Sequence, residues 1–256
     1  MSTRSDDPPP YANPIQAPGT AEGLWAAWSG WDAMHEFPLP AAGSVVVVAA
    51  HPDDEVLGFG GTLARLSDLG HQMTVVAVTD GEGSHPHSRV LRPHELAAIR
   101  SEETRAALGR LGAGHADVVQ LHIPDSQVAR YEDDLCKALA PLCRGAALVA
   151  APWSGDMHSD HEAAGRATRA AAQAVGASFV EYPIWLWHWA QPGDPRVPWS
   201  RAAQLPLNLE VQARKRHAVD AFASQILPLG PGAQDAAILP PEEIAHHLRP
   251  REVVFQ

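Results

Sequence analysis

A run of four valines that ends in a histidine and three acids constrains this chain more than any other feature. Six consecutive apolar residues, Val45–Ala50, are typical of a strand buried on both faces of a parallel sheet. The run ends abruptly in His51-Pro52-Asp53-Asp54-Glu55. Open α/β sheets bind their ligands at the carboxyl ends of their strands, so a functional site is expected directly after this strand.

Further strands and helices alternate along the chain. The patterns predict strands over 44–50, 72–78, 117–121 and 146–151, and helices over about 56–69, 94–111, 131–144 and 162–175. Short links between them imply parallel pairing with helical crossovers. We therefore expect an α/β fold, a single-domain Rossmann-like and mostly parallel sheet flanked by helices over residues 21–256, preceded by a flexible Pro-rich arm over 1–20.

The remaining segments are less regular. The patterns predict a fifth strand over 181–189 with three alternating tryptophans, an edge strand over 204–208, a helix over 210–225 and a last strand over 252–255. Within that helix, Lys215 is expected to face solvent. Trp25, Trp28 and Trp31 recur at spacing three, which predicts a helical stripe docked in the core. The loop over 84–93 is expected to lie beside the site, with its histidines solvated.

Composition limits the classes of protein that need to be considered. A net charge of −11 disfavours a nucleic-acid-binding surface. Cys136 and Cys143 lie two turns apart on a predicted helix, too far for a disulfide. The sequence has no apolar run of eighteen residues and no apolar segment near Met1, so we expect neither a membrane span nor a signal peptide, and a cytoplasmic location.

A second loop rich in acids and histidines follows the strand predicted over 146–151. It carries Asp156, His158, Asp160 and His161. Imidazole and carboxylate ligands together suit Zn²⁺, and Fe²⁺ is also compatible with them. Two adjacent acids after the first strand can divide the work, one binding the metal and one facing its water. An acidic turn that caps a helix explains one such loop but hardly two.

Together the two motifs resemble the LmbE-like (PIG-L) family of zinc-dependent N-deacetylases. The resemblance rests on Ala-His-Pro-Asp-Asp-Glu at 50–55 and on His-Ser-Asp-His at 158–161, and it covers about residues 44–190. Residues 79–82 and 100–103 also match the family pattern, whereas residues 191–256 vary between members. Ser159 stands where members often have proline, and Asp156 where some sugar deacetylases have a tyrosine that helps to hold the intermediate.

The resemblance implies a metal site and its ligands. His51, Asp54 and His161 would bind Zn²⁺ and leave one or two positions open for water and a substrate oxygen.

The resemblance also implies roles for five other residues. Asp53 would be the general base for the metal-bound water, and His158 would stabilise the oxyanion. Asp160 would hold His158 protonated and aligned. Arg100 and Asp125 would hydrogen-bond the hydroxyls of a sugar.

The expected function is a metal-dependent hydrolase that removes an acetyl group from an N-acetyl amine. The implied substrate is an N-acetylglucosaminyl-type sugar of a small glycoside or glycoconjugate. A metal-dependent amidase acting on a thiol-sugar conjugate or a non-sugar acyl amine stays open, as does a non-catalytic metal- or glycan-binding member. A nucleotide-binding protein is disfavoured because no G-x-G-x-x-G follows the first strand, where acids would repel a pyrophosphate.

Overall fold

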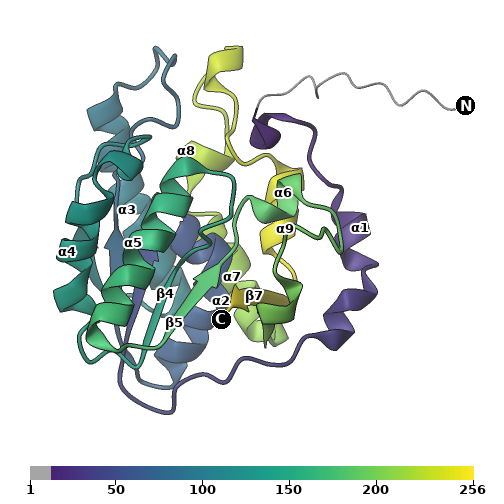
Figure 1. Ribbon diagram of the computed structural model, residues 1–256. Helices are drawn as coiled ribbons and strands as arrows, with labels where there is room; N and C mark the ends of the chain where they lie inside the picture. Colours follow the sequence, from purple (N-terminus) through teal and green to yellow (C-terminus); the bar gives the residue numbers. More distant parts are fainter. Residues whose placement is uncertain (1–12) are drawn as a thin grey trace, which may run out of the picture.

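A seven-stranded sheet with helices on both faces forms the centre of the structure (Figure 1). The computed structural model describes residues 13–256. The strand order is β3-β2-β1-β4-β5-β7-β6, in which β1 to β5 run parallel and β7 runs antiparallel to both of its neighbours. The predicted fold class, a mostly parallel α/β sheet flanked by helices, is confirmed.

The elements of the parallel part follow the predicted alternation closely. They are β1 (Ser44–Ala49), α2 (Asp54–Asp68), β2 (Gln72–Ala77), α3 (Pro93–Leu111), β3 (Asp117–Gln120), α4 (Glu132–Cys143), β4 (Leu148–Pro152), α5 (Ser159–Val175) and β5 (Phe179–Tyr182). The other helices and strands are α1 (Glu22–Ala26), α6 (Leu186–Trp189), β6 (Ala202–Pro206), α7 (Leu209–Val219), α8 (Ala223–Ile226), α9 (Pro241–His247) and β7 (Arg251–Phe255). Short 3-10 turns are η1 (Pro14–Gln16), η2 (Ser29–Ala33), η3 (Val128–Arg130), η4 (Trp199–Arg201) and η5 (Ala233–Asp235).

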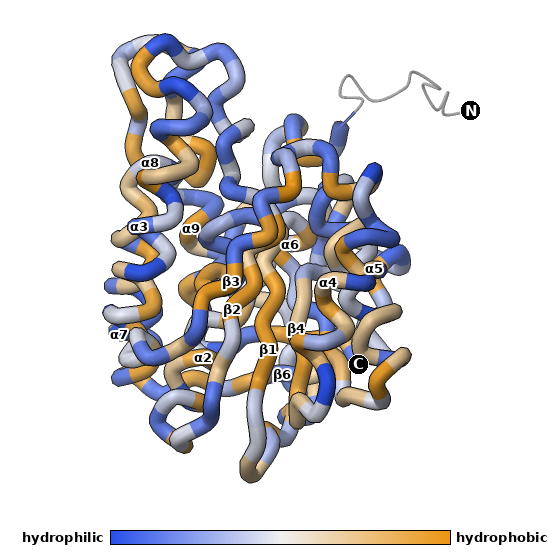
Figure 2. Tube along the Cα trace, turned by 90° about the vertical axis from the view of Figure 1, so that its left-hand side faces the viewer, coloured by the Kyte–Doolittle hydropathy of each residue, from blue (hydrophilic) through white to orange (hydrophobic). Residues whose placement is uncertain are grey.

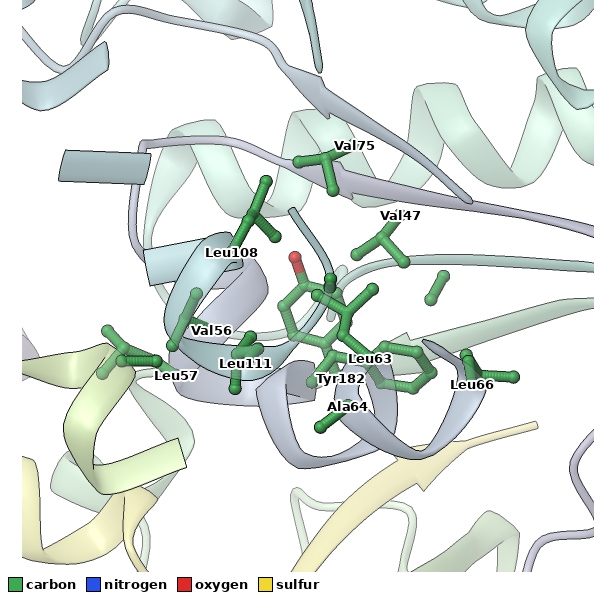
Figure 3. Packing of buried hydrophobic residues seen from close by; sticks show 14 of the residues in the cluster. Val47, Val56, Leu57, Leu63, Ala64, Leu66, Val75, Leu108, Leu111 and Tyr182 are labelled. Carbon is green, nitrogen blue, oxygen red and sulfur yellow. The ribbon is translucent and has the colours of Figure 1, made fainter. Parts of the chain in front are cut away.

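The valine run is apolar throughout because both faces of β1 are covered. Val45 and Val47 belong to the cluster beneath α2, α3 and α7, and Val46 and Val48 to the cluster beneath α4 and α5. Figure 3 shows Val47 on the strand side of the first cluster, opposite side chains of the covering helices. In Figure 2 the central strands are largely orange, while the loops above them contain much more blue.

The strand predicted over 181–189 is wrong beyond Tyr182. Pro183 has no N–H for a strand ladder, and the next amides turn away to bind a buried carboxylate, so the chain continues as α6. Trp187 nevertheless packs in the core, in a cluster with Trp25 and Trp31. These last two residues lie on α1 and η2 and not on one helix, although their expected burial is confirmed.

Lys215 is buried, contrary to the prediction, with an exposed fraction of 1%. The predicted helix over 210–225 stops at Val219, and its Lys215 Nζ donates to Glu252 Oε1 at 2.6 Å and to the Leu57 carbonyl at 2.8 Å. Glu252 also accepts the backbone N–H of Thr62 at 2.8 Å. The Lys215–Glu252 pair therefore links β7 to α2, and no local sequence pattern in the helix predicts this contact.

Three other expectations concern a disulfide bond, a membrane-spanning helix and the N-terminal arm. Cys136 and Cys143 are both free, as expected. None of the helices in residues 13–256 is long and apolar enough to cross a membrane. Residues 1–12 of the predicted arm lie outside the described part of the chain.

We predict that Lys215→Met lowers the free energy of unfolding by about 3–5 kcal/mol, because it leaves the Glu252 carboxylate buried without its charged partner. Urea denaturation measures this loss. The matched control is Arg216→Met on the exposed face of the same helix, for which a change within about 0.5 kcal/mol is expected. Equal stabilities of the two variants would contradict the assignment.

Candidate metal centre

The two predicted loops meet because β1 and β4 are neighbours in the sheet. The chain proceeds from β1 outward to β2 and β3, and then returns to β4 and β5 on the other side. The carboxyl ends of β1 and β4 therefore flank the point where the strand order reverses, where α/β sheets bind ligands. His51 follows β1, and His158 and His161 lie at the start of α5. The ring centroids of His158 and His161 lie 4.5 Å apart, and those of His51 and His158 lie 4.9 Å apart.

A strained turn joins β1 to α2. Asp53 has a φ of 135°, a region that non-glycine residues rarely adopt and that costs on the order of 1–3 kcal/mol. Its N–H donates to Glu55 Oε2 at 3.1 Å, and its carbonyl accepts the N–H groups of Val56 and Leu57 in the first turn of α2. The turn places Asp53 and Asp54 on the floor of the same pocket.

Asp156 fixes which nitrogen of His161 is available. His161 Nδ1 lies 2.8 Å from Asp156 Oδ2, and because a carboxylate only accepts, Nδ1 carries the proton. Nε2 is thereby left available as a ligand, and it lies 3.4 Å from Asp54 Oδ1. A histidine held by a carboxylate through its other nitrogen is the arrangement typical of metal ligands.

His51 is oriented in the same way by two other acids. Its Nε2 lies 3.2 Å from Asp125 Oδ1 and 3.4 Å from Asp160 Oδ2, so this nitrogen carries the proton. Burial opposes a charge on the ring, but hydrogen bonds to Asp125 and Asp160 outweigh it and raise the pKa of His51 to about 10. The surroundings of this imidazole therefore favour its protonated, positively charged form.

The remaining nitrogens of the two rings face each other. His51 Nδ1 and His161 Nε2 are 3.2 Å apart, and Asp54 Oδ2 lies 3.8 Å from His51 Nδ1. Two lone pairs at that separation repel unless a cation lies between them, either a proton or a metal ion. Ligands about 2.0–2.1 Å from a tetrahedral zinc would be about 3.3 Å apart, so the donors fit such an ion. The three predicted ligands are thus brought together.

His158 differs from its prediction. Its Nδ1 accepts the backbone N–H of Asp160 at 3.3 Å, while the Asp160 carboxylate binds the N–H groups of Ser126 and Val128. Asp160 therefore does not hold His158 protonated. Burial, followed by the neighbouring imidazoles of His161 and His51, lowers the pKa of His158 to about 2. The neutral ring keeps its proton on Nε2, where it can still be donated to an oxygen.

The geometry also permits other ligand sets. One donor atom from each of His51, His158 and His161 falls within a common 4.8 Å, and so do those of His51, Asp125 and Asp160. The second set uses the His51 nitrogen that faces away from His161. The part of the chain that the structure describes thus contains a metal-binding His/Asp group, with its ligand set open to experiment.

Arg100 contacts Asp53, a partner that its position in the sequence does not reveal. Its Nη2 donates to Asp53 Oδ2 at 2.9 Å and to the Pro52 carbonyl at 2.6 Å, and Nη1 donates to Gly81. Only the buried Nε lacks a partner within residues 13–256, so direct contact with a sugar stays a prediction. Burial raises the pKa of Asp53 to about 7, although the Arg100 guanidinium lowers it.

The centre opens into a pocket of about 220 Å³. Asp125 lines it and accepts the N–H of Gly83 at 2.9 Å, while its predicted bond to a sugar hydroxyl stays a prediction. Ile184, Trp185, Gln225, Ile238 and Leu239 complete the wall.

The rim is fastened by a bond between distant loops. His85 Nε2 binds the Ala236 carbonyl at 3.1 Å, so this histidine is buried and its predicted solvation is wrong.

The sequence patterns did not predict the roles of two residues in the site, Asp156 and Gln225. Asp156 is fully buried behind His161 and also accepts the N–H groups of Ile184, Trp185 and Leu186. Its spacing of five from His161 was a usable signal. Gln225 comes from a segment with no motif, and nothing in the sequence marks it as part of the wall.

Comparisons with known proteins agree with this geometry. Residues 46–172 match the family model described as PIG-L: GlcNAc-PI de-N-acetylase. The chain is 30% identical to diacetylchitobiose deacetylase of Thermococcus kodakarensis over 133 residues, which are 50% of this chain and 48% of that protein. It is also 30% identical to 1D-myo-inositol 2-acetamido-2-deoxy-alpha-D-glucopyranoside deacetylase 1 of Catenulispora acidiphila, over 68% of this chain and 61% of that protein. The chain thus spans about half to three-fifths of the length of these two relatives.

Solved structures show the same fold. A conserved protein of Thermus thermophilus has a TM-score of 0.53 at 28% identity, covering 72% of this chain and 80% of that one. N,N'-diacetylchitobiose deacetylase of Pyrococcus horikoshii has a TM-score of 0.53 at 22% identity, covering 70% and 68%.

We predict that Asp156→Asn weakens zinc binding about 10- to 100-fold, because the amide no longer enforces the Nδ1–H form of His161. Competition of the apoprotein with a chromophoric chelator measures the affinity. Asp133→Asn on the exposed face of α4 is the control and should bind zinc like the unaltered protein. Unchanged affinity in Asp156→Asn would contradict the role given to this carboxylate.

Proposed function

The chain belongs to the PIG-L (LmbE-like) family through residues 46–172, and on this premise we propose that it is a zinc-dependent N-deacetylase. Its substrate is an N-acetylglucosaminyl-type group of a small glycoside or glycoconjugate. The observation that carries the proposal is the 3.2 Å approach of His51 Nδ1 and His161 Nε2, with Asp53 beside them in an open pocket. A binding module would not need that acid.

In the proposed mechanism, His51, Asp54 and His161 would hold the metal. A divalent cation bound there would supply Lewis acidity, which polarises an amide carbonyl and acidifies water. Asp53 takes the proton from the attacking water. Burial raises the pKa of this carboxyl, which makes the carboxylate more basic and better able to accept that proton.

Neutral His158 serves as the second donor to the developing oxyanion. With Nδ1 occupied by the Asp160 N–H, its Nε2–H is directed at an oxygen without placing a further positive charge beside the metal. A donor of this kind contributes roughly 3–4 kcal/mol to lowering the barrier in favourable cases. Asp160 acts on the site through His51 and the backbone, and therefore as a positioning residue.

Arg100 positions the base. Its bonds to Asp53, Pro52 and Gly81 hold the carboxylate in the strained turn and partly offset the effect of burial on its pKa. Asp125, which lines the pocket, is proposed to accept a hydrogen bond from a substrate hydroxyl.

Acetate release tests the function. We expect the zinc-loaded protein to release acetate from N-acetylglucosamine glycosides, to lose this activity on treatment with a chelator, and to regain it with zinc or Fe²⁺. Asp53→Asn should lower kcat by at least about 100-fold while zinc affinity stays within about twofold, since a general base contributes about 10²–10⁴-fold. Equal turnover by Asp53→Asn would contradict the role of Asp53 as the general base, whereas the absence of acetate release from every glycoside by the zinc-loaded protein would favour the non-catalytic alternative. Products identified by mass spectrometry separate acetyl sugars from thiol-sugar amides.

The pH dependence tests the Arg100 contact. Because Asp53 must be ionised, kcat/KM should fall on the acid side of the pH profile, as this carboxylate takes up a proton. Arg100→Met removes the charge that lowers the Asp53 pKa, so the acid limb should move upward by about 1–3 pH units. The control is Arg105→Met at an exposed position of the same helix. A limb that stays in place in a folded Arg100→Met protein would exclude the contact from catalysis.

A further inference from the structure

A second hollow adjoins the metal pocket. It has a volume of about 610 Å³ and lies between the segment 15–22, α6 and the segment 237–246. Figure 1 shows this N-terminal segment passing beside α6 and α9. Trp185 and Ile238 line both the metal pocket and this hollow, so the two spaces are adjacent and share these side chains.

The walls of the second hollow are built and fixed. His188 Nε2 binds the Ala17 carbonyl at 2.8 Å, and its Nδ1 pairs with the carboxylate of Glu243. Thr20 donates its N–H to the His188 carbonyl at 2.8 Å and its hydroxyl to the Ala190 carbonyl at 2.7 Å. These bonds clamp the N-terminal segment onto α6.

The hollow is lined by apolar residues, among them Ile15, Ala17, Pro18, Ala237, Ile238 and Pro240, and by the polar side chains of Thr20, Glu22, His188, Glu242, Glu243 and His246. The acids Glu22 and Glu243 are already paired, Glu22 with Arg249 and His246, and Glu243 with His188. Glu242, at the exposed end, makes no ion pair within residues 13–256. The lining therefore offers contact to apolar groups and no free cation to an anion.

The metal pocket alone is smaller than the roughly 300–1,000 Å³ of typical small-molecule sites, whereas the two spaces together fall within that range. Asp156 moreover holds both His161 and the N–H of Trp185, so the position of the shared tryptophan is tied to the metal centre.

Resting on the proposed function, we propose that the second hollow is the subsite for the group attached to the sugar, and that this group is neutral and apolar. The acetylated amine lies at the metal pocket, and its aglycone passes over Trp185 and Ile238 into the space bounded by residues 15–22 and 237–246. A phosphate-linked aglycone does not suit this space, because its only unpaired charge, within residues 13–256, is the carboxylate of Glu242.

Three glycosides test the proposal by acetate release: methyl and octyl N-acetylglucosaminide, and N-acetylglucosamine 1-phosphate. The octyl glycoside should have a kcat/KM at least about 10-fold above that of the methyl glycoside, a factor for which two buried methylenes suffice. The 1-phosphate should be poorer than the methyl glycoside. Equal values for methyl and octyl, or a preference for the phosphate, would overturn the proposal while leaving the deacetylase function intact.

Ala237→Trp fills the hollow from a position that does not line the metal pocket. It should bring the octyl-to-methyl ratio of kcat/KM close to one. Ala233→Trp, in the same loop but outside both spaces, should keep the ratio of the unaltered protein. A ratio that survives Ala237→Trp would place the octyl chain elsewhere.

Measurements of glycoside binding distinguish the proposed subsite from the proposed deacetylase function. Calorimetry with Asp53→Asn and with Asp53→Asn/Ala237→Trp measures glycoside affinity without turnover. Tighter binding of the octyl than of the methyl glycoside, lost on Ala237→Trp, supports the subsite even if no glycoside releases acetate and the deacetylase function fails. Equal binding of the two glycosides to Asp53→Asn refutes the subsite whatever the activity.

Discussion

The close approach of two imidazole nitrogens, His51 Nδ1 and His161 Nε2, is the interaction on which the rest of the site depends. It arises from the topology, because β1 and β4 pair in parallel and deliver both loops to one point. Each ring is turned by acids that bind its opposite nitrogen, Asp125 and Asp160 for His51 and Asp156 for His161. Without those acids either ring could rotate, and a cation would lose its ligands.

Gathering so many acids under one pocket has an electrostatic cost that shapes the surroundings. Burial of the carboxyl, followed by the charge of Asp53, raises the pKa of Glu55 to about 8, so Glu55 is largely protonated at neutral pH. Arg100 supplies a positive charge next to Asp53, and a metal ion would supply more. The strain at Asp53 belongs to the same arrangement, since an unstrained turn would point its carboxylate elsewhere.

The sequence was informative where a pattern is local. The valine run, the His-Pro-Asp-Asp-Glu turn and the second histidine loop predicted the sheet and the metal centre, because strand ends in a parallel sheet share one edge. The failures involve long-range partners. Lys215 lies on a polar helix and is buried only because Glu252 arrives from the last strand. The tryptophans of 185–189 alternate as in a strand, but Pro183 and the Asp156 carboxylate impose a turn. Asp160 serves His51 and not its sequence neighbour His158.

Asp156 joins the chemistry of the site to its shape. A tyrosine at this position, as some sugar deacetylases have, would present a hydroxyl where this chain has a carboxylate that accepts three backbone N–H groups and the His161 ring. The carboxylate cannot donate to an oxyanion, so in the proposed mechanism that task falls to His158. The Asp156 carboxylate instead fixes the turn that places Ile184 and Trp185 in the pocket wall. The same side chain thus selects the tautomer of a candidate metal ligand and sets the position at which the second hollow begins.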